Sequence, residues 1–423
     1  MNITEKVFNR IDGEEIASLA LLLADIYGPV GHEEQVGETV FKWLCDQGFS
    51  AQKQIVAGTR FNVLGMVKGT GGGKNLAFNS HMDTLPVFQG EAQTGVENRK
   101  AYRAWREGNR LFGLAMLNDR GPMAAFLIAA KALKESGIRL KGDLLLTAVV
   151  GEIGSAKIEE YQGAEYLGKG AGTKQAIIEG PPLDYALVAE TTNFGISWVN
   201  SGVAYVKVTV AGQSIYTPRL RVEAGSPVTD HPNAIVKMSL VMERITRWAQ
   251  EYQEKHKKSS PCGMIRPKVN IGAIRGGIPY SPSQTAASCS IYLDIWLPPE
   301  TSLEEILEEL QDVLDRTGLK LRPEVYLYRK GYTGKGGEEL VGAVSRAYRE
   351  ISGTEPPSVS EDITSMWRDT NVYHEMGIPS VTFGPIRHQS PDFPDKYLTV
   401  ADLVMTAKIY GKTAMKICGV AEA

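Results

Sequence analysis

Short runs of apolar residues alternate along the chain with longer segments whose apolar residues recur at helical spacing. Four of the short runs, at 76–78, 144–150, 185–189 and 378–383, predict strands that are buried on both faces. The longer periodic segments at 121–135 and 401–417 predict helices that cover those strands. We therefore expect an α/β fold with a central, mostly parallel sheet flanked by helices.

The pattern changes between residues 200 and 332. Val206, Val208 and Val210 alternate with polar neighbours, which is typical of a strand with one face in water. A helix at 233–252, strands at 268–274 and 285–297, a second helix capped by Ser302, and a strand at 324–328 follow. This β-α-β-β-α-β order predicts a ferredoxin-like α+β domain. It is inserted at 200–332 between two parts of the first domain, 1–199 and 333–423.

Composition and charge exclude several classes of protein. The chain is 43% hydrophobic and 22% charged, as in ordinary globular proteins, and 46 basic residues nearly balance 49 acidic ones. A formal charge of -3 gives no field that favours nucleic acid or an anionic membrane. Apolar runs are too short for a membrane helix, the start does not resemble a signal peptide, and the four cysteines lack metal-site spacing. We expect a cytoplasmic protein with a small-molecule substrate.

Polar residues that could carry chemistry follow the predicted strands. His81 and Asp83 are two residues apart and share a face of an extended segment, which suits an imidazole ligand oriented by a carboxylate. Glu152 and Glu190 end two further strands, where ligands gather in open α/β sheets. With His388 near the C-terminus, these side chains form a set of nitrogen and oxygen donors that suits zinc, manganese or cobalt.

Five segments resemble, in order and spacing, those of the M20 metallopeptidases, which include aminoacylases, acetylornithine deacetylase, succinyl-diaminopimelate desuccinylase and a glutamate-releasing carboxypeptidase. The segments are SHMDTLP at 80–86, GLAMLNDRGPMAA at 113–125, GEIGS at 151–155, YALVAETTN at 185–193 and GIPSVTFGP at 377–385. The resemblance covers nearly the whole chain. It implies a metal-dependent hydrolase of an amide, peptide or related C–N bond in a small molecule. It also implies that 200–332 is a lid and dimerisation domain of a homodimer.

The chain departs from the family where two metal ions are bridged. The family motif Asp-x-Lys-Gly supplies the bridging carboxylate, and alignment on Arg120-Gly121 puts Asn118 at that position. A neutral amide cannot offset the repulsion between two divalent ions, so we expect one ion, with zinc as the first choice. Asp119 is the neighbouring acid and would replace the bridge only if the turn is shifted. We take Asp83 and Asp119 as the candidate catalytic residues.

A second departure concerns the general base. Family members have two adjacent glutamates, a general base and then a metal ligand, whereas this chain has Gly151 followed by Glu152. Loss of a positioned acid-base group lowers a rate by about 10²- to 10⁴-fold. Either another acid acts, with Asp119, Glu159 and Glu160 as candidates, or the chemistry is not ordinary amide hydrolysis.

The C-terminal ligand and the lid residues also differ. Alignment puts Asp392 at the position of the family's ligand histidine, but His388 is close by, and we favour it because imidazole is the better zinc ligand. In the inserted domain the family's substrate-binding histidine becomes Tyr216 and its arginine becomes Trp296, with Arg275 nearby. These three are the candidate substrate-binding residues, and we expect an aromatic or neutral substrate.

Two other functions stay open. The first is an enzyme of the same fold whose chemistry is metal-independent or non-hydrolytic, so that its activity is insensitive to chelators. The second is a non-catalytic protein that binds a small ligand in a degenerate active site. For that protein, changing Gly151 to Glu and Asn118 to Asp is expected to restore hydrolysis.

Overall fold

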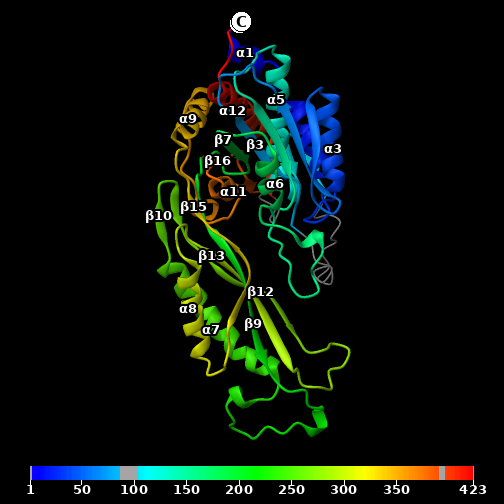
Figure 1. The fold of residues 1–423 in the computed structure, drawn as a ribbon, viewed down its shortest axis with the longest axis vertical. Helices are drawn as coiled ribbons and strands as arrows, with labels where there is room; N and C mark the ends of the chain where they lie inside the picture. The colour runs from blue at the N-terminus through cyan, green and yellow to red at the C-terminus, as the bar shows by residue number, and fades with distance from the viewer. Residues whose placement is uncertain (1, 86–102, 390–395, 423) are drawn as a thin grey trace. The chain divides into compact units, whose positions relative to one another are not determined.

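The computed structural model describes residues 2–85, 103–389 and 396–422. The chain divides into two compact units (Figure 1). The first unit comprises Met1–Trp198, Gly334–Ile363 and Arg368–Ala423. The second comprises Val199–Thr333 together with the short segment Thr364–Trp367.

The first unit is built on a six-stranded sheet. Its strands lie in the order β1 (Ser50–Ala57), β2 (Arg60–Val67), β6 (Leu144–Val149), β3 (Leu76–His81), β7 (Tyr185–Ala189) and β16 (Ser380–Phe383). The last four are mutually parallel, while β2 pairs antiparallel with both β1 and β6. The expected α/β class is confirmed, and the parallel strands bring their carboxyl ends to one edge.

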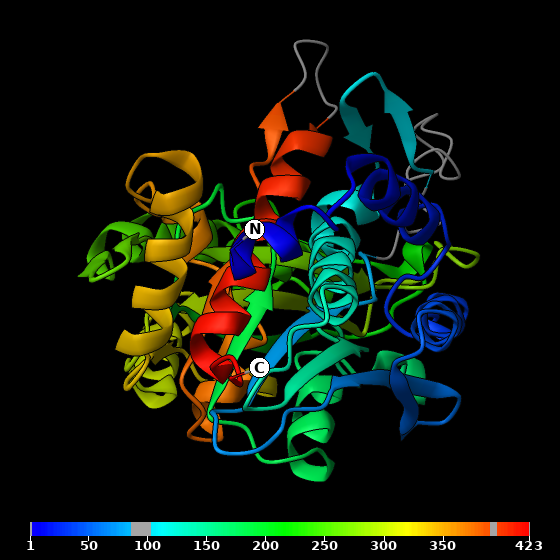
Figure 2. The ribbon, with the colours of Figure 1, turned by 90° about the horizontal axis from the view of Figure 1, so that it is seen from above.

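Alternate residues of β3 enter two different hydrophobic clusters, because neighbouring side chains of a strand point to opposite faces. Leu76 and Phe78 belong to the larger cluster, which includes residues of α2, α5, α9 and α12, whereas Ala77 packs with residues of α6 and α11. Helices α5 and α12 lie side by side over the larger cluster (Figure 2). The helices of this unit are α1 (Ile3–Phe8), α2 (Gly13–Ala24), α3 (Glu34–Asp46), α5 (Gly121–Glu135), α6 (Ala171–Glu179), α9 (Glu338–Ser352), α11 (Thr370–Glu375) and α12 (Val400–Cys418).

Asn79 and His81 continue the alternation on the side of β3 that faces α6 and α11. Both side chains are buried, so this end of the strand holds polar groups, whereas its first three residues are apolar. A second, small sheet of the unit has the order β17 (His388–Gln389), β18 (Lys396–Thr399), β5 (Arg110–Phe112) and β4 (Trp105–Glu107).

The second unit has the expected element order. Its antiparallel sheet has the order β12 (Val269–Gly276), β13 (Ser288–Leu297), β9 (Gly202–Ala211) and β14 (Pro323–Arg329), packed with α7 (Ala234–Lys255) and α8 (Leu303–Asp315). The Ser302 side chain accepts a hydrogen bond from the Glu305 backbone N–H and caps α8. Two short pairs complete the unit, β10 (Lys258–Ser260) with β11 (Gly263–Ile265), and β8 (Val199–Asn200) with β15 (Tyr332–Thr333). Helix α10 (Glu361–Thr364) ends where the chain re-enters this unit.

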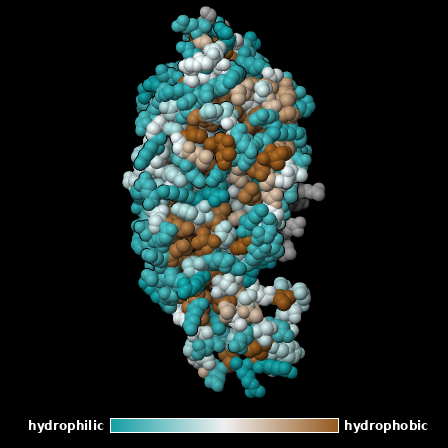
Figure 3. Space-filling model, viewed as in Figure 1, coloured by the Kyte–Doolittle hydropathy of each residue, from teal (hydrophilic) through white to brown (hydrophobic). Residues whose placement is uncertain are grey.

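Apolar residues on the face drawn in Figure 3 form small groups separated by hydrophilic residues. Among the helices that the structure describes, none combines the length and the apolar character needed to cross a membrane.

Candidate metal centre

The site is built around His81, the last residue of β3. Its Nδ1 lies 2.8 Å from the Asp83 main-chain oxygen, which can only accept a hydrogen bond. Nδ1 therefore carries the proton in the neutral ring, and Nε2 presents its lone pair to the site. The Asp83 carboxylate, at 3.7 Å from Nδ1, instead accepts hydrogen bonds from the backbone N–H groups of Glu152 (3.2 Å) and Ile153 (2.7 Å). Asp83 thus joins the end of β3 to the loop after β6.

The turn before α5 places two neighbouring side chains against His81. Asn118 and Asp119 depart from helical backbone angles, and the peptide bond between them is cis. The His81 Nε2 atom lies 3.2 Å from Asn118 Oδ1 and 3.0 Å from Asp119 Oδ2. The buried Arg120 anchors the turn, because its guanidinium donates to the main-chain oxygens of Leu23, Ile26, Gly28 and Met82.

Three side chains in the described part of the chain converge closely enough to bind one cation. They are His81, Asp119 and Glu190, each buried, with one donor atom apiece lying within 4.8 Å of the others. Neither carboxylate oxygen of Asp119 has a hydrogen-bond donor within the described residues, although Oδ2 lies 3.0 Å from the ring nitrogen Nε2 of His81. Buried carboxylate oxygens without donors are costly. The donor set and these orphan atoms fit a divalent metal ion such as zinc.

Glu152 lies beside this group but outside it. Its Oε2 is 3.8 Å from His81 Nε2, and its side chain is buried. The preceding residue, Gly151, has φ +71°, and a Cβ there would lie 2.8 Å from the Leu167 main-chain oxygen and 3.0 Å from Arg60 Nη2. The backbone at position 151 is therefore shaped for glycine.

Glu190, directly after β7, is paired with an arginine that sequence analysis did not select. The Arg368 Nε donates a hydrogen bond to Glu190 Oε2, and both side chains are buried. A second hydrogen bond runs from Arg368 Nη1 to the Ile363 main-chain oxygen at 2.6 Å. No local sequence pattern marks Arg368, because its importance comes from the packing of a distant segment against the end of β7.

Asp369, also missed by sequence analysis, lies on the Asn79 side of β3. Its Oδ2 accepts hydrogen bonds from Asn79 Nδ2 (3.0 Å) and Thr173 Oγ1 (2.7 Å), while its Oδ1 has no partner in the described residues. Thr147 Oγ1 donates in turn to Asn79 Oδ1 at 2.7 Å. This polar layer ties β3 and β6 to α6 and the start of α11 beneath the site.

Burial and mutual repulsion raise the pKa values of the acids around His81. Burial raises the pKa of Asp119 to about 7, with the charge of Glu190 adding to the shift. Burial raises the pKa of Glu152 to about 8 and that of Asp369 to about 6. Burial alone would lower the pKa of His81, but Asp119, Glu152 and Asp83 together raise it well above its ordinary value. Without a metal, the site therefore holds protons where a cation would otherwise lie.

The structure does not bring the remaining candidates of the first unit into the group. His388 Nε2 lies 2.7 Å from Asp402 Oδ2, at the start of α12, and its ring stacks on Tyr397. Asp392 lies outside the described residues. Glu159 and Glu160 are exposed at the tip of a turn that is closed by a bridge between Ile158 and Tyr161.

The three candidate substrate-binding residues belong to the second unit. Tyr216 is half-exposed and pairs with Gln284 in an isolated bridge. Arg275 is exposed on the edge strand β12. Trp296 lies on β13, and its Nε1 donates to Asp294 Oδ2 at 2.9 Å.

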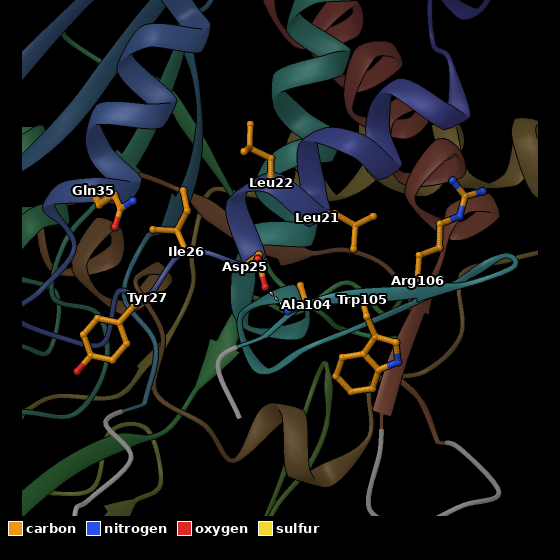
Figure 4. Close-up of a pocket in the computed structure, with 9 residues that line it drawn as sticks. All are labelled: Leu21, Leu22, Asp25, Ile26, Tyr27, Gln35, Ala104, Trp105 and Arg106. Carbon is orange, nitrogen blue, oxygen red and sulfur yellow. Dashed lines mark hydrogen bonds between the residues drawn. The ribbon is translucent and has the colours of Figure 1, made fainter. Parts of the chain in front are cut away.

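A pocket of about 530 Å³ lies elsewhere in the first unit, at the end of α2 (Figure 4). Leu22 and Tyr27 line it with the indole of Trp105. The Asp25 carboxylate accepts a hydrogen bond from the Ala104 backbone N–H at 2.9 Å, and Arg106 pairs with Glu14. The charged groups of the pocket are thus already paired, and none of the metal-binding candidates His81, Asp119 and Glu190 lines it.

Comparison with known proteins assigns the family. The chain is 24% identical to an N-formyl-4-amino-5-aminomethyl-2-methylpyrimidine deformylase of Bacillus subtilis, over 94% of this chain and 93% of the relative. It is 26% identical to carboxypeptidase G2 of a Pseudomonas strain, over 74% and 67% of the two chains. The Bacillus subtilis protein YXEP, described as a dinuclear metal-binding M20 peptidase, has the same fold, with a TM-score of 0.60 at 12% identity over 96% and 98% of the chains. The model of peptidase family M20/M25/M40 matches residues 77–416, so the chain belongs to this family.

Proposed function

We propose that this protein is a metal-dependent hydrolase of an amide or related C–N bond in a small molecule, and that it uses one divalent ion, zinc in the first instance. The ion would be held by His81 Nε2, Asp119 and Glu190. The observation that carries the proposal is the convergence of these three buried donors, with both Asp119 oxygens lacking hydrogen-bond donors in the described residues.

A bound divalent ion would polarise the substrate carbonyl and lower the pKa of water at the site. The chain's own residues would do the rest. Asp83 fixes the tautomer of His81 through its main-chain oxygen and holds the Glu152 backbone through its carboxylate. Asn118 places a neutral amide oxygen beside His81 Nε2, where the family has a bridging carboxylate.

Glu152 is our candidate for the acid-base role that Gly151 cannot perform. It is a buried carboxyl beside the donor group, and with a single ion it is not needed as a ligand. A general base works best when its pKa lies near the working pH, and burial raises the pKa of Glu152 to about 8. Asp119 remains the alternative, but as a base it could not also serve as an anionic ligand.

The substrate that we favour is a small N-acyl amide of a neutral, aromatic amine. Trp296 occupies the position of the family's carboxylate-binding arginine, which disfavours N-acyl amino acids as substrates. One relative acts, by its name, on an N-formylated aminomethylpyrimidine. The inserted domain of family members also leads us to expect a homodimer, which light scattering on the purified chain would test.

The experiment is an activity screen of N-formyl and N-acetyl arylmethylamines against N-acyl amino acids, with and without added zinc. We expect turnover of the aromatic amides that is lost after chelation and returns with zinc. Activity that persists after chelation would favour the metal-independent enzyme. A chain that binds aromatic amides but turns over none, with or without metal, would favour the non-catalytic binding protein.

A further inference from the structure

The centre contains a permanent cation of its own. The Arg368 guanidinium is hydrogen bonded to Glu190, one of the three converging donors, and the two side chains are only 3% and 9% exposed. Its Nη1 is fixed to the Ile363 main-chain oxygen, so the side chain is held from two sides.

A guanidinium and a divalent ion compete for the same carboxylate oxygens, because both bind through positive charge and both need oxygen lone pairs. One oxygen of Glu190 is already taken by Arg368. A second ion would have to approach this guanidinium in a buried site, and no carboxylate stands at position 118 to screen the repulsion.

In two-metal carboxylate centres the second metal ion helps to neutralise the negative charge of the carboxylates. We propose that Arg368 does this here, and so restricts this site to one ion. This inference rests on the proposed function, since it presumes that one ion binds. Arg368 is on this account a residue that determines metal stoichiometry, and Asn118 alone does not explain the loss of the second ion.

The test counts zinc ions per chain in four full-length proteins. They are the wild type, Asn118→Asp, Asn118→Asp with Arg368→Met, and Asn118→Asp with Arg368→Lys. Each is stripped of metal, checked for folding by circular dichroism, and titrated with zinc by calorimetry, with elemental analysis after desalting. The methionine and lysine variants are matched in size, and only lysine keeps a positive charge.

We expect one ion in the wild type, one in Asn118→Asp, two when Arg368→Met is added, and one when Arg368→Lys is added instead. Two ions in Asn118→Asp alone would overturn the role of Arg368 while leaving the proposed function intact. Two ions in the wild type would overturn both the role of Arg368 and the single-ion stoichiometry, while the assignment as a metal-dependent hydrolase would stand. One ion in the methionine double variant, or two in the lysine double variant, would overturn the role of Arg368 as well. The Asn118→Asp protein keeps the Arg368 pair, so it tests the inference even if removal of Arg368 unfolds the chain. A wild type that binds no zinc would refute the proposed function itself.

Discussion

Two buried carboxyl groups beside His81, those of Asp119 and Glu152, are expected to respond differently to the same change. Asp119→Asn removes an anionic ligand and should abolish tight zinc binding. Glu152→Gln leaves the three proposed ligands in place but removes a proton acceptor. The turnover number should therefore fall by about 10²- to 10⁴-fold with zinc content unchanged. Elemental analysis and steady-state kinetics on the two variants provide the comparison. Loss of zinc in Glu152→Gln would instead identify Glu152 as a ligand.

The backbone at Gly151 predicts a cost for any side chain there. Gly151→Ala should lower the free energy of unfolding by about 1–2 kcal/mol for the positive φ, and by more for the contact with the Leu167 main-chain oxygen at 2.8 Å. Gly137 has φ +73° and nothing within 4 Å of an added Cβ, so Gly137→Ala is the matched control for backbone strain alone. Urea denaturation should find Gly151→Ala the less stable variant.

Equal stability of the two variants would show that the loop at Gly151 has room for a side chain. On the present geometry, Gly151→Glu would strain this loop. Failure of the Gly151→Glu, Asn118→Asp protein to hydrolyse simple amides would therefore not by itself favour the non-catalytic function.

The buried ion pair of Arg60 with Glu33 stabilises the loop after β6. Arg60, the first residue of β2, donates to both carboxylate oxygens of Glu33 and to the main-chain oxygens of Ala164 and Leu167. Arg60→Met should destabilise the protein by about 3–5 kcal/mol, because Glu33 is left buried without its partner. Arg106→Met, which breaks the exposed pair with Glu14, should leave the stability nearly unchanged, because water screens an exposed ion pair. Thermal unfolding of both variants provides the measurement, and similar losses would contradict this ranking.

The strands of the first unit could be predicted because a strand that is buried on both faces has a short, continuous run of apolar residues in the sequence. His81, Glu152 and Glu190 could be singled out because each follows such a run at a strand end. The inserted unit was predictable from its alternating strands and the capped helix at Ser302.

The partners of these residues could not be predicted. Arg368 reaches Glu190 from a segment 178 residues away, and Asp369 meets Asn79 from 290 residues away. His388 has the residue type of a zinc ligand, but whether it lies near the site depends on how α12 packs, and in the structure it bonds Asp402. Side chains from distant segments meet only in the folded chain, so neither spacing nor periodicity reveals them.

The metal-free protein should become less stable as pH rises. The pKa values of Asp119, Glu152 and Asp369 are raised to about 7, 8 and 6, and that of His81 is also raised. A raised pKa means that the folded chain holds more protons than the unfolded chain, so the free energy of unfolding falls as pH rises from about 4 to 8. Melting curves of stripped protein across this range should show a falling Tm, and the gain from added zinc should grow with pH because the donors must be deprotonated. A stripped protein that is most stable at the alkaline end would contradict this.

The central claim is that His81, Asp119 and Glu190 together hold one divalent ion, and an anomalous difference map tests it most directly. Crystals of the full chain soaked in zinc, with data collected on both sides of the zinc absorption edge, should show one strong peak in the first unit. It should lie about 2.0–2.2 Å from His81 Nε2 and from an oxygen of each acid. A map with no peak between these three side chains would contradict the account.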